Sequence, residues 1–436
     1  MAAEASVIGG ADAWSALLAV FAELFHQPTA IIFARLATGW VLCPGRHTLT
    51  RIYPLAEPDR HKAHDAYHRF FRAGAWCMSR MWEQMARRLV ERFHSCGAIP
   101  LTLDDTAFHK SGRKVEGAGW WRDAVRSTGQ RVVHCFGLNL VVLCLRVDPP
   151  WGGEPLSLPI HLRLHRKGEE TLLDLAEAMI REVAQWFPDR TLQLCADGFY
   201  ATLAGRKLPH THLTSRMRSD AAIYTAPPPR RPHQRGRSRK RGRRLPTPKQ
   251  LAKRTQGWKR STVTMRGKSR VRLLLTVDVL WYAVCPDRMV RLVICRDPEG
   301  REDDDFLFAT DLKATPEVVV SDYAGRWSIE DTFRNVKQHL GGEDPQCWKG
   351  PGPARAAHFS FWLYSAVWLW YLQTQGCRRS WLPLPWYPRK CTPSFADALA
   401  TLRRALWTQR IIPHSDHAAL PRKIAATLIN VLAMAA

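Results

Sequence analysis

The order of the apolar segments in the middle of the chain constrains its fold most strongly. Residues 99–106 (IPLTLDDT) predict a short strand, residues 132–147 a long and continuously hydrophobic strand, and residues 156–164 a third strand. An amphipathic helix is predicted over residues 169–187, and a buried strand over residues 191–196 follows it. Three strands, a helix and a further strand are the element order of an α/β fold.

Acidic side chains follow two of these strands. Asp104 and Asp105 end the first strand, and Asp197 comes directly after the strand over residues 191–196. Open α/β sheets place their functional sites at the carboxyl ends of their strands. The two acidic positions therefore predict a site at that end of the sheet.

The segment over residues 321–340 (SDYAGRWSIEDTFRNVKQHL) is predicted to be one helix with charged and hydrogen-bonding side chains along one face. Tyr323, Glu330 and Lys337 are spaced by seven residues and stay on nearly the same line of such a helix. Arg326 lies on that face too, three residues after Tyr323. A carboxylate flanked by these groups suits a site that holds a metal and grips phosphates. The alternative is a surface helix with ordinary charge pairs.

The acids suggest a particular chemistry. A single α/β sheet can bring together Asp104 or Asp105, Asp197 and Glu330. Phosphodiester cleavage by two metal ions needs oxygen ligands that hold the ions roughly 3.5 to 4 Å apart. Carboxylates suit Mg²⁺ or Mn²⁺ in this role.

Residues 226–260 differ in composition from the rest of the chain, because they are rich in Pro and Arg with almost no aliphatic residues. We expect a mobile basic loop that contacts the DNA backbone. The alternative is a charge run that only solubilises the chain or resembles a nuclear-targeting signal. The net charge of +25 favours a polyanionic partner, which could be DNA, RNA or an anionic membrane. The arginines expected to contact DNA are Arg235, Arg237, Arg239, Arg241, Arg243 and Arg244.

The spacing Tyr-x2-Arg-x3-Glu-x6-Lys resembles the YREK signature around the last catalytic acid of the DDE transposases of insertion sequences, and all four positions match. LDDT at residues 103–106 is similar to the Asp-x-Thr strand end of these enzymes, and ADGFY at residues 196–200 to their second Asp. The resemblance covers roughly residues 100–373. It implies an α/β fold with an RNase H-like mixed sheet, flanking helices, a β-rich insertion, and helical N- and C-terminal regions.

The resemblance also implies a function. The catalytic acids that bind two Mg²⁺ ions, or Mn²⁺ in their place, would be Asp104, Asp197 and Glu330. Phosphates at the transposon end would be held by Tyr323, Arg326 and Lys337. The activity would be cut-and-paste transposition of double-stranded DNA by a homodimer in a synaptic complex. The alternatives are a nuclease of the same fold without strand transfer, and a domesticated DNA-binding protein that has lost catalysis.

The residues alone leave open which of two neighbouring aspartates is the first acid. Alternation along a strand puts Asp105 on one face with Leu103, and Asp104 on the other with Thr106. A central strand can be covered on both faces, so alternation does not decide. The Asp-x-Thr pattern of the family favours Asp104 as the ligand.

Five regions are expected along the chain. They are a helical DNA-binding domain (residues 1–96), the first part of the catalytic core (97–217), a basic loop with a β-rich insertion (218–305), the second part of the core with the Glu helix (306–375), and a helical tail (376–436).

The sequence also bears on where the protein resides. The apolar run over residues 359–372 is shorter than the roughly 20 residues that a membrane span needs, so we expect a buried core helix there. The N-terminus lacks the basic and apolar pattern of a signal peptide. We therefore expect a cytoplasmic, nucleoid-associated protein without a membrane partner.

Overall fold

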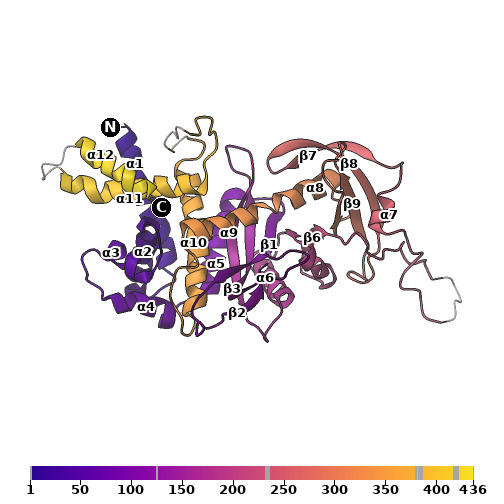
Figure 1. Cartoon of the computed structure of the whole chain (residues 1–436), viewed down its shortest axis with the longest axis horizontal. Coiled ribbons are helices and arrows are strands. Elements are labelled where there is room, and N and C mark those ends of the chain that lie inside the picture. Colours follow the sequence, from indigo (N-terminus) through magenta and orange to yellow (C-terminus); the bar gives the residue numbers. More distant parts are fainter. Residues whose placement is uncertain are drawn as a thin grey trace.

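A computed structural model of the chain describes residues 2–123, 126–230, 236–378, 381, 386–415 and 422–435. Figure 1 shows three parts side by side: a layer of helices at one end, a mixed sheet in the middle and an antiparallel β region at the other end.

The middle part is a mixed sheet in which β3 (His134–Val147) pairs antiparallel with both β1 (Ile99–His109) and β4 (Leu156–His165). On its other side, β1 pairs parallel with β5 (Leu192–Ala196), and β5 pairs parallel with β6 (Thr211–Arg216). The short strand β2 (Gly119–Arg122) pairs with the start of β3. The α/β fold with a mixed sheet, which the sequence predicts, is confirmed.

The β-rich region after β6 continues this sheet. Its strands run antiparallel in the order β10-β9-β8-β7, and β10 pairs with β6. They are β7 (Lys259–Met265), β8 (Lys268–Val279), β9 (Val290–Arg296) and β10 (Asp305–Ala309). The short helix α7 (Pro248–Leu251) lies beside them (Figure 1). Ten strands therefore form one sheet across the described part of the chain.

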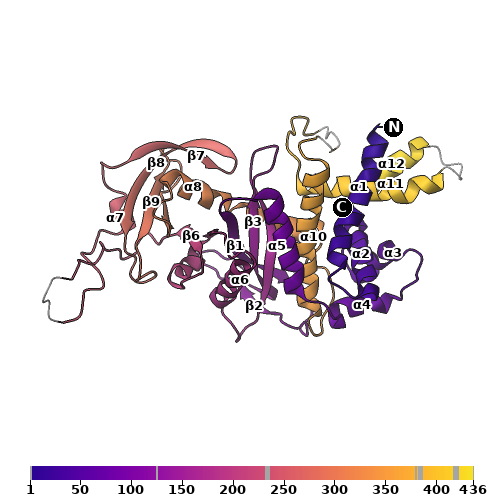
Figure 2. The same ribbon diagram turned by 180° about the vertical axis from the view of Figure 1, so that it is seen from behind.

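Helices cover both faces of the central strands. On the face seen in Figure 1, α9 (Ser328–His339) packs on β4 and β1. Figure 2 shows the other face, where α5 (Met78–Phe93) and α6 (Leu172–Trp186) lie. A 3-10 helix, η1 (Gly198–Gly205), follows β5, and α8 (Pro316–Gly325) packs on β7.

The helical layer surrounds α10 (Gly352–Thr374), which is buried along nearly its whole length. Its other members are α1 (Ala2–Ala22), α2 (Gln27–Leu42), α3 (Leu49–Ala56), α4 (His64–Ala73), α11 (Phe395–Ser415) and α12 (Arg422–Met434). The apolar run over residues 359–372 lies within α10, which confirms the predicted core helix. Among the described residues, no helix is long and apolar enough to cross a membrane.

Hydrogen bonds within the helical layer join segments that are far apart in the sequence. The indole of Trp370 donates to the carbonyl of Gly10 at 2.7 Å. The guanidinium of Arg403 donates to the carbonyls of Val41 and Cys43 at 2.6 and 2.9 Å, where α2 ends. One hydrophobic core runs from this layer into the sheet. The division of the chain into five regions stays a prediction.

The prediction of a single helix over residues 321–340 is wrong. The segment forms α8 and α9, with Arg326 and Trp327 in a turn between them. The amides of Ile329 and Glu330 bond to the carbonyls three residues earlier, at 3.1 Å each. The amides of Arg326 and Trp327 bond in the same way to the carbonyls of Tyr323 and Ala324, at 3.2 and 3.4 Å, so this 3-10 type of bonding ends α8 and continues into the first turn of α9. Tyr323 and Glu330 therefore belong to different helices.

A second correction concerns the strand that carries the first acids. The sequence predicts that it ends at Thr106, but β1 continues to His109. The reason is that β3 pairs with β1 as far as His109, whereas β5 pairs with it only as far as Leu103. Asp104 and Asp105 therefore lie in the middle of β1, at the point where its parallel neighbour stops.

Candidate active site

The end of β5 brings two of the predicted acids side by side. Leu103 of β1 is opposite Ala196, the last residue of β5, so Asp104 and Asp197 come next on the two chains. Asp197 keeps an extended backbone (φ −71°, ψ 176°) and caps η1. Its carboxylate accepts the amides of Phe199 at 2.9 Å and Tyr200 at 3.4 Å. A sheet-end aspartate is thus fixed by the turn that follows it.

Asp104 lies on the face of the sheet that α9 covers. Thr102, two residues before it and on the same face, has its hydroxyl 3.0 Å from that of Ser157. The Ser157 hydroxyl is in turn 2.6 Å from that of Ser328, the first residue of α9. This buried chain of hydroxyls ties the start of α9 to β1 and β4. Glu330, two residues further along α9, is exposed.

Asp105 lies on the opposite face of β1, toward η1. The phenol of Tyr200 donates to its carboxylate at 2.9 Å. Tyr200 is fully buried, so this bond holds Asp105 to the same turn that Asp197 caps. The two neighbouring aspartates consequently have different surroundings: α9 for Asp104 and η1 for Asp105.

The turn between α8 and α9 aims Arg326 at the first acid. Its Nη1 is 2.5 Å from Oδ2 of Asp104, and the residue is 5% exposed. The guanidinium also lies over the rings of Tyr323 and Trp327, at 5.6 and 5.2 Å from their centroids. A buried arginine in this place offsets the negative charge of a buried carboxylate.

The electrostatics show that the acids share one environment. Burial raises the pKa of the Asp104 carboxyl to about 7. The charge of Arg326 opposes this shift, whereas the charges of three other acids add to it, namely Asp197, Asp105 and Glu330. Burial also raises the pKa of Asp105 to about 6. Carboxylates that disfavour one another's charge in this way fit divalent cations with oxygen ligands, such as Mg²⁺ and Mn²⁺.

Two other residues of the predicted site lie outside this acid cluster. Tyr323 is 8% exposed and packs in an apolar cluster with Cys195 and Val319. The ammonium of Lys337 lies 6.0 Å from the ring centroid of Phe108, on β1 beyond the acids. Neither side chain contacts Glu330 among the described interactions.

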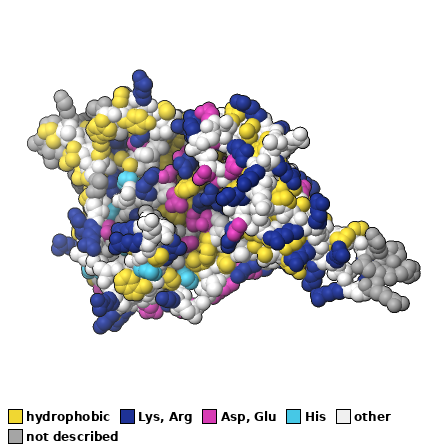
Figure 3. All heavy atoms as spheres, turned by 45° about the vertical axis from the view of Figure 1, so that its right-hand side comes forward, with side chains coloured by type: hydrophobic (Ala, Val, Ile, Leu, Met, Phe, Trp, Pro, Cys, Tyr) yellow, Lys and Arg dark blue, Asp and Glu magenta, His cyan; other side chains and the backbone are white. Residues whose placement is uncertain are grey.

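The basic segment over residues 226–260 lies at the end of the molecule that α7 occupies, far from the acids (Figure 1). The prediction of a loop over this whole range is wrong, because the segment contains α7 and the first two residues of β7. Arg235 falls outside the described residues. Arg241 donates to the Tyr224 hydroxyl at 2.9 Å and stacks over that ring and the ring of Tyr282. The other predicted arginines are exposed, namely Arg237, Arg239, Arg243 and Arg244. Figure 3 shows acidic side chains gathered in the middle of one face, with Lys and Arg side chains around them.

The role of Tyr200 could not be predicted from the sequence. The motif ADGFY contains it, but nothing in that motif shows that a 3-10 turn returns the phenol to β1. Trp327, which is 42% exposed beside Arg326, could not be predicted either, because a continuous helix gives that position no special orientation.

A comparison with protein families agrees with this arrangement. A family model described as a DDE superfamily endonuclease matches residues 21–272, which is more than half of the chain. The chain belongs to this family. No curated protein matches it.

Because the chain belongs to the DDE endonuclease family, it is an enzyme that acts on the phosphodiester bonds of DNA. Enzymes of this family use divalent metal ions. The mixed sheet of β4-β3-β1-β5-β6 is consistent with the RNase H-like fold of such enzymes. The match includes Asp104 and Asp197 but ends before α8 and α9. The place of Glu330 in the site therefore rests on the structure and on the YREK resemblance.

Proposed function

We propose that this DDE endonuclease is a transposase of the insertion-sequence type with a YREK signature. The observation that carries the proposal is the turn between α8 and α9. It directs Arg326 of the signature onto Asp104 and starts the helix that carries Glu330. A charge-paired surface helix, the alternative interpretation of this segment, would not bury its arginine against an aspartate 222 residues away.

In this proposal Asp104, Asp197 and Glu330 would hold two Mg²⁺ ions, and such ions would supply activation of the attacking oxygen and stabilisation of the leaving oxygen. Arg326 positions the Asp104 carboxylate, and Lys337 with Tyr323 and Arg326 grips the phosphates at the transposon end. Asp105 is a positioning residue that Tyr200 holds.

The proposed reaction has two steps at phosphorus. Water attacks a phosphodiester at the transposon end, so a new P–O bond forms, the bond to the 3′ oxygen breaks, and a free 3′-OH results. That 3′-OH then attacks a phosphodiester of the target DNA, where one P–O bond forms as another breaks. The second step conserves the number of phosphodiester bonds and therefore needs no external energy source. A homodimer would hold the two ends together.

The test uses purified protein and labelled DNA that carries the element's own ends, with Mg²⁺ and a target plasmid. We expect nicked ends together with labelled target molecules that result from strand transfer. Nicks without joined products would support the alternative of a nuclease of the same fold. Binding without any metal-dependent product would support a domesticated DNA-binding protein.

The exposed arginines of the basic segment are predicted to act through phosphates. Replacing Arg237, Arg239, Arg243 and Arg244 with Gln should weaken binding to all DNA sequences alike. The slope of log affinity against log salt should become shallower by as much as about 3.6, at ~0.9 for each phosphate contact. Fluorescence anisotropy at several salt concentrations measures this slope.

A matched control removes four exposed arginines that already pair with an acid. They are Arg87, Arg181, Arg218 and Arg301, with partners Glu83, Glu177, Asp220 and Glu299. The control has the same net charge as the test variant, so a general charge effect would change both slopes equally. An unchanged slope in the test variant would show that the basic segment does not contact DNA.

A further inference from the structure

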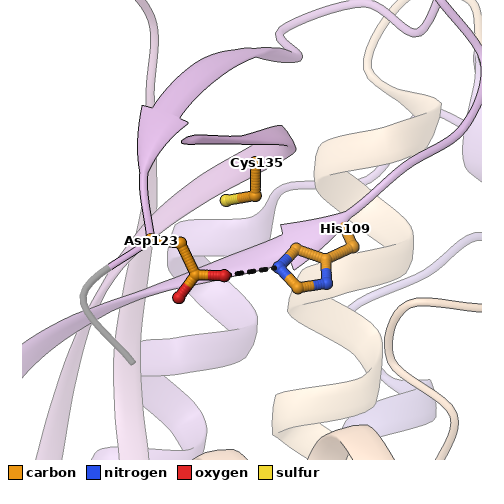
Figure 4. Close-up of side chains that lie close together, drawn as sticks. All are labelled: His109, Asp123 and Cys135. Carbon is orange, nitrogen blue, oxygen red and sulfur yellow. Dashed lines mark ion pairs between the residues drawn. The ribbon is translucent and has the colours of Figure 1, made fainter. Parts of the chain in front are cut away.

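Three side chains that commonly bind metals converge at the far end of β1, apart from the acid cluster. His109 is the last residue of β1, Asp123 directly follows β2, and Cys135 lies near the start of β3. Their ligand atoms all lie within 4.8 Å of one another, and His109 Nε2 is 3.8 Å from Asp123 Oδ2. Figure 4 shows the three side chains pointing toward one another from neighbouring strands.

The backbone around this group is fixed by the sheet. The amide of Asp123 donates to the carbonyl of Val133 at 2.8 Å, which extends the pairing of β2 with the chain before β3. Gly137 of β3 lies opposite His109, and a Cβ there would be 2.0 Å from the carbonyl oxygen of Phe108. Only glycine permits this close approach of β1 to β3. Strand pairing therefore sets the backbone positions of His109 and Cys135. The Asp123 carboxylate is held by Arg126, whose amide donates to Oδ1 at 3.0 Å and whose guanidinium lies 3.6 Å from Oδ2.

A carboxylate on the other side of the imidazole orients His109. Glu343 Oε1 accepts the His109 amide at 2.8 Å and lies 3.9 Å from its Nδ1. The remaining ring nitrogen, Nε2, faces Asp123. Histidines that bind zinc commonly have a carboxylate beside the nitrogen that does not bind the metal.

We propose that His109, Asp123 and Cys135 form a zinc site that is separate from the acid cluster. Nitrogen, oxygen and sulfur donors together suit Zn²⁺, whereas Mg²⁺ and Ca²⁺ take oxygen ligands. Tetrahedral zinc places such donor atoms about 3.3 to 3.7 Å apart, close to the His109–Asp123 distance. Asp123 and Cys135 are each 8% exposed, so a bound ion would be shielded from solvent on two sides. Three protein ligands leave the fourth position for water.

The site has a structural consequence for the surface next to it. His109 also lines a cavity of about 770 Å³, together with the basic residues Lys110, Arg113 and Lys114 of the loop that leaves β1. Zinc would join the ends of three strands at the base of this loop. It would therefore stabilise one wall of a basic cavity, and it would take no part in the reaction at the acid cluster.

The test is metal binding by the full-length protein after chelation and desalting. We expect about one equivalent of tightly held Zn²⁺, and a rise in melting temperature when Zn²⁺ is added. Co²⁺ in its place should give a thiolate-to-metal charge-transfer band in the near ultraviolet. Cys135→Ser should abolish that band. His109→Gln and Asp123→Asn should each weaken Zn²⁺ binding by more than ~10-fold.

The controls separate this site from other groups. Cys96→Ser removes an exposed thiol just before β1 and should leave the band unchanged. An Asp104→Asn, Glu330→Gln double variant should still bind Zn²⁺, because it retains all three ligands. His109 is only half-buried, so His109→Gln keeps the test decisive even if Cys135→Ser does not fold. A charge-transfer band that persists in Cys135→Ser, or Zn²⁺ binding that is unchanged in His109→Gln, would overturn the proposal.

Discussion

Glu330→Gln should reduce metal-dependent cleavage of end DNA by roughly a thousandfold or more while leaving DNA binding intact. The amide keeps the size and polarity of the side chain but removes the charge that would hold a divalent ion. A loss of several kcal/mol of transition-state stabilisation corresponds to that factor in rate. Glu330 is exposed in the first turn of α9, so the substitution should not disturb the core. Single-turnover cleavage of labelled end DNA measures the effect.

The next residue of the same helix supplies the control. Asp331 pairs with Arg334 on the surface of α9. Exposed ion pairs of this kind contribute at most about 1 kcal/mol to stability, so Asp331→Asn should cleave within a few-fold of the wild type. Equal activity of Glu330→Gln and Asp331→Asn would remove Glu330 from the proposed site, whatever the fate of the other acids.

Asp104→Asn should reduce cleavage by about the same factor as Glu330→Gln. Asp105→Asn should reduce it only ~10-fold. The difference follows from their two faces, because Asp104 faces α9 and Arg326, while Asp105 accepts the phenol of Tyr200. An amide oxygen at position 105 can still accept that hydrogen bond. Tyr200→Phe removes that bond and leaves both acids in place, so it tests the positioning of Asp105 separately from its charge and should also reduce cleavage without abolishing it. An inactive Asp105→Asn beside an active Asp104→Asn would exchange the two assignments.

Stability in the presence of a chelator gives a second measure that does not depend on activity. The raised pKa values, about 7 for Asp104 and about 6 for Asp105, mean that the folded state keeps protons that the unfolded state releases near pH 4. The contribution of these groups to stability is therefore fully present below about pH 4 and is lost as the pH rises to 7. Asp104→Asn cannot titrate there, so its melting temperature should fall less over this range than that of the wild type.

The sequence predicts the parts of the site that depend on local pattern. Hydrophobic segments over residues 99–106 and 191–196 predict the two parallel strands, and the acids that follow the paired part of each strand are enough to predict where they meet. The YREK spacing predicts Glu330 and Arg326 as site residues because four residue types at fixed distances form a specific pattern; the structure places Arg326 against Asp104, and the role of Glu330 stays a prediction. Each of these predictions concerns either one element or two neighbouring parallel strands whose carboxyl ends lie at the same edge of the sheet.

The remaining features depend on contacts between elements, which periodicity does not contain. The turn at Arg326 has ordinary helical residues, and it forms where Arg326 meets Asp104, 222 residues earlier in the chain. The bond from Tyr200 to Asp105 likewise requires η1 to fold back on β1. His109, Asp123 and Cys135 show no metal-binding spacing in the sequence, since three strands are needed to bring them together.

The contacts of Arg403 have a consequence for how the protein is made. Its guanidinium bonds to the carbonyl of Val41, which is 362 residues earlier, at the end of α2. At a synthesis rate of about 5 to 20 residues per second, α2 waits roughly 20 to 70 seconds for this partner. During that time the apolar sides of α1 and α2 lack α10 and α11, against which they pack in the finished molecule. Helices α1 and α2 thus leave the ribosome well before their packing partners, and nascent chains should need chaperone protection over that interval.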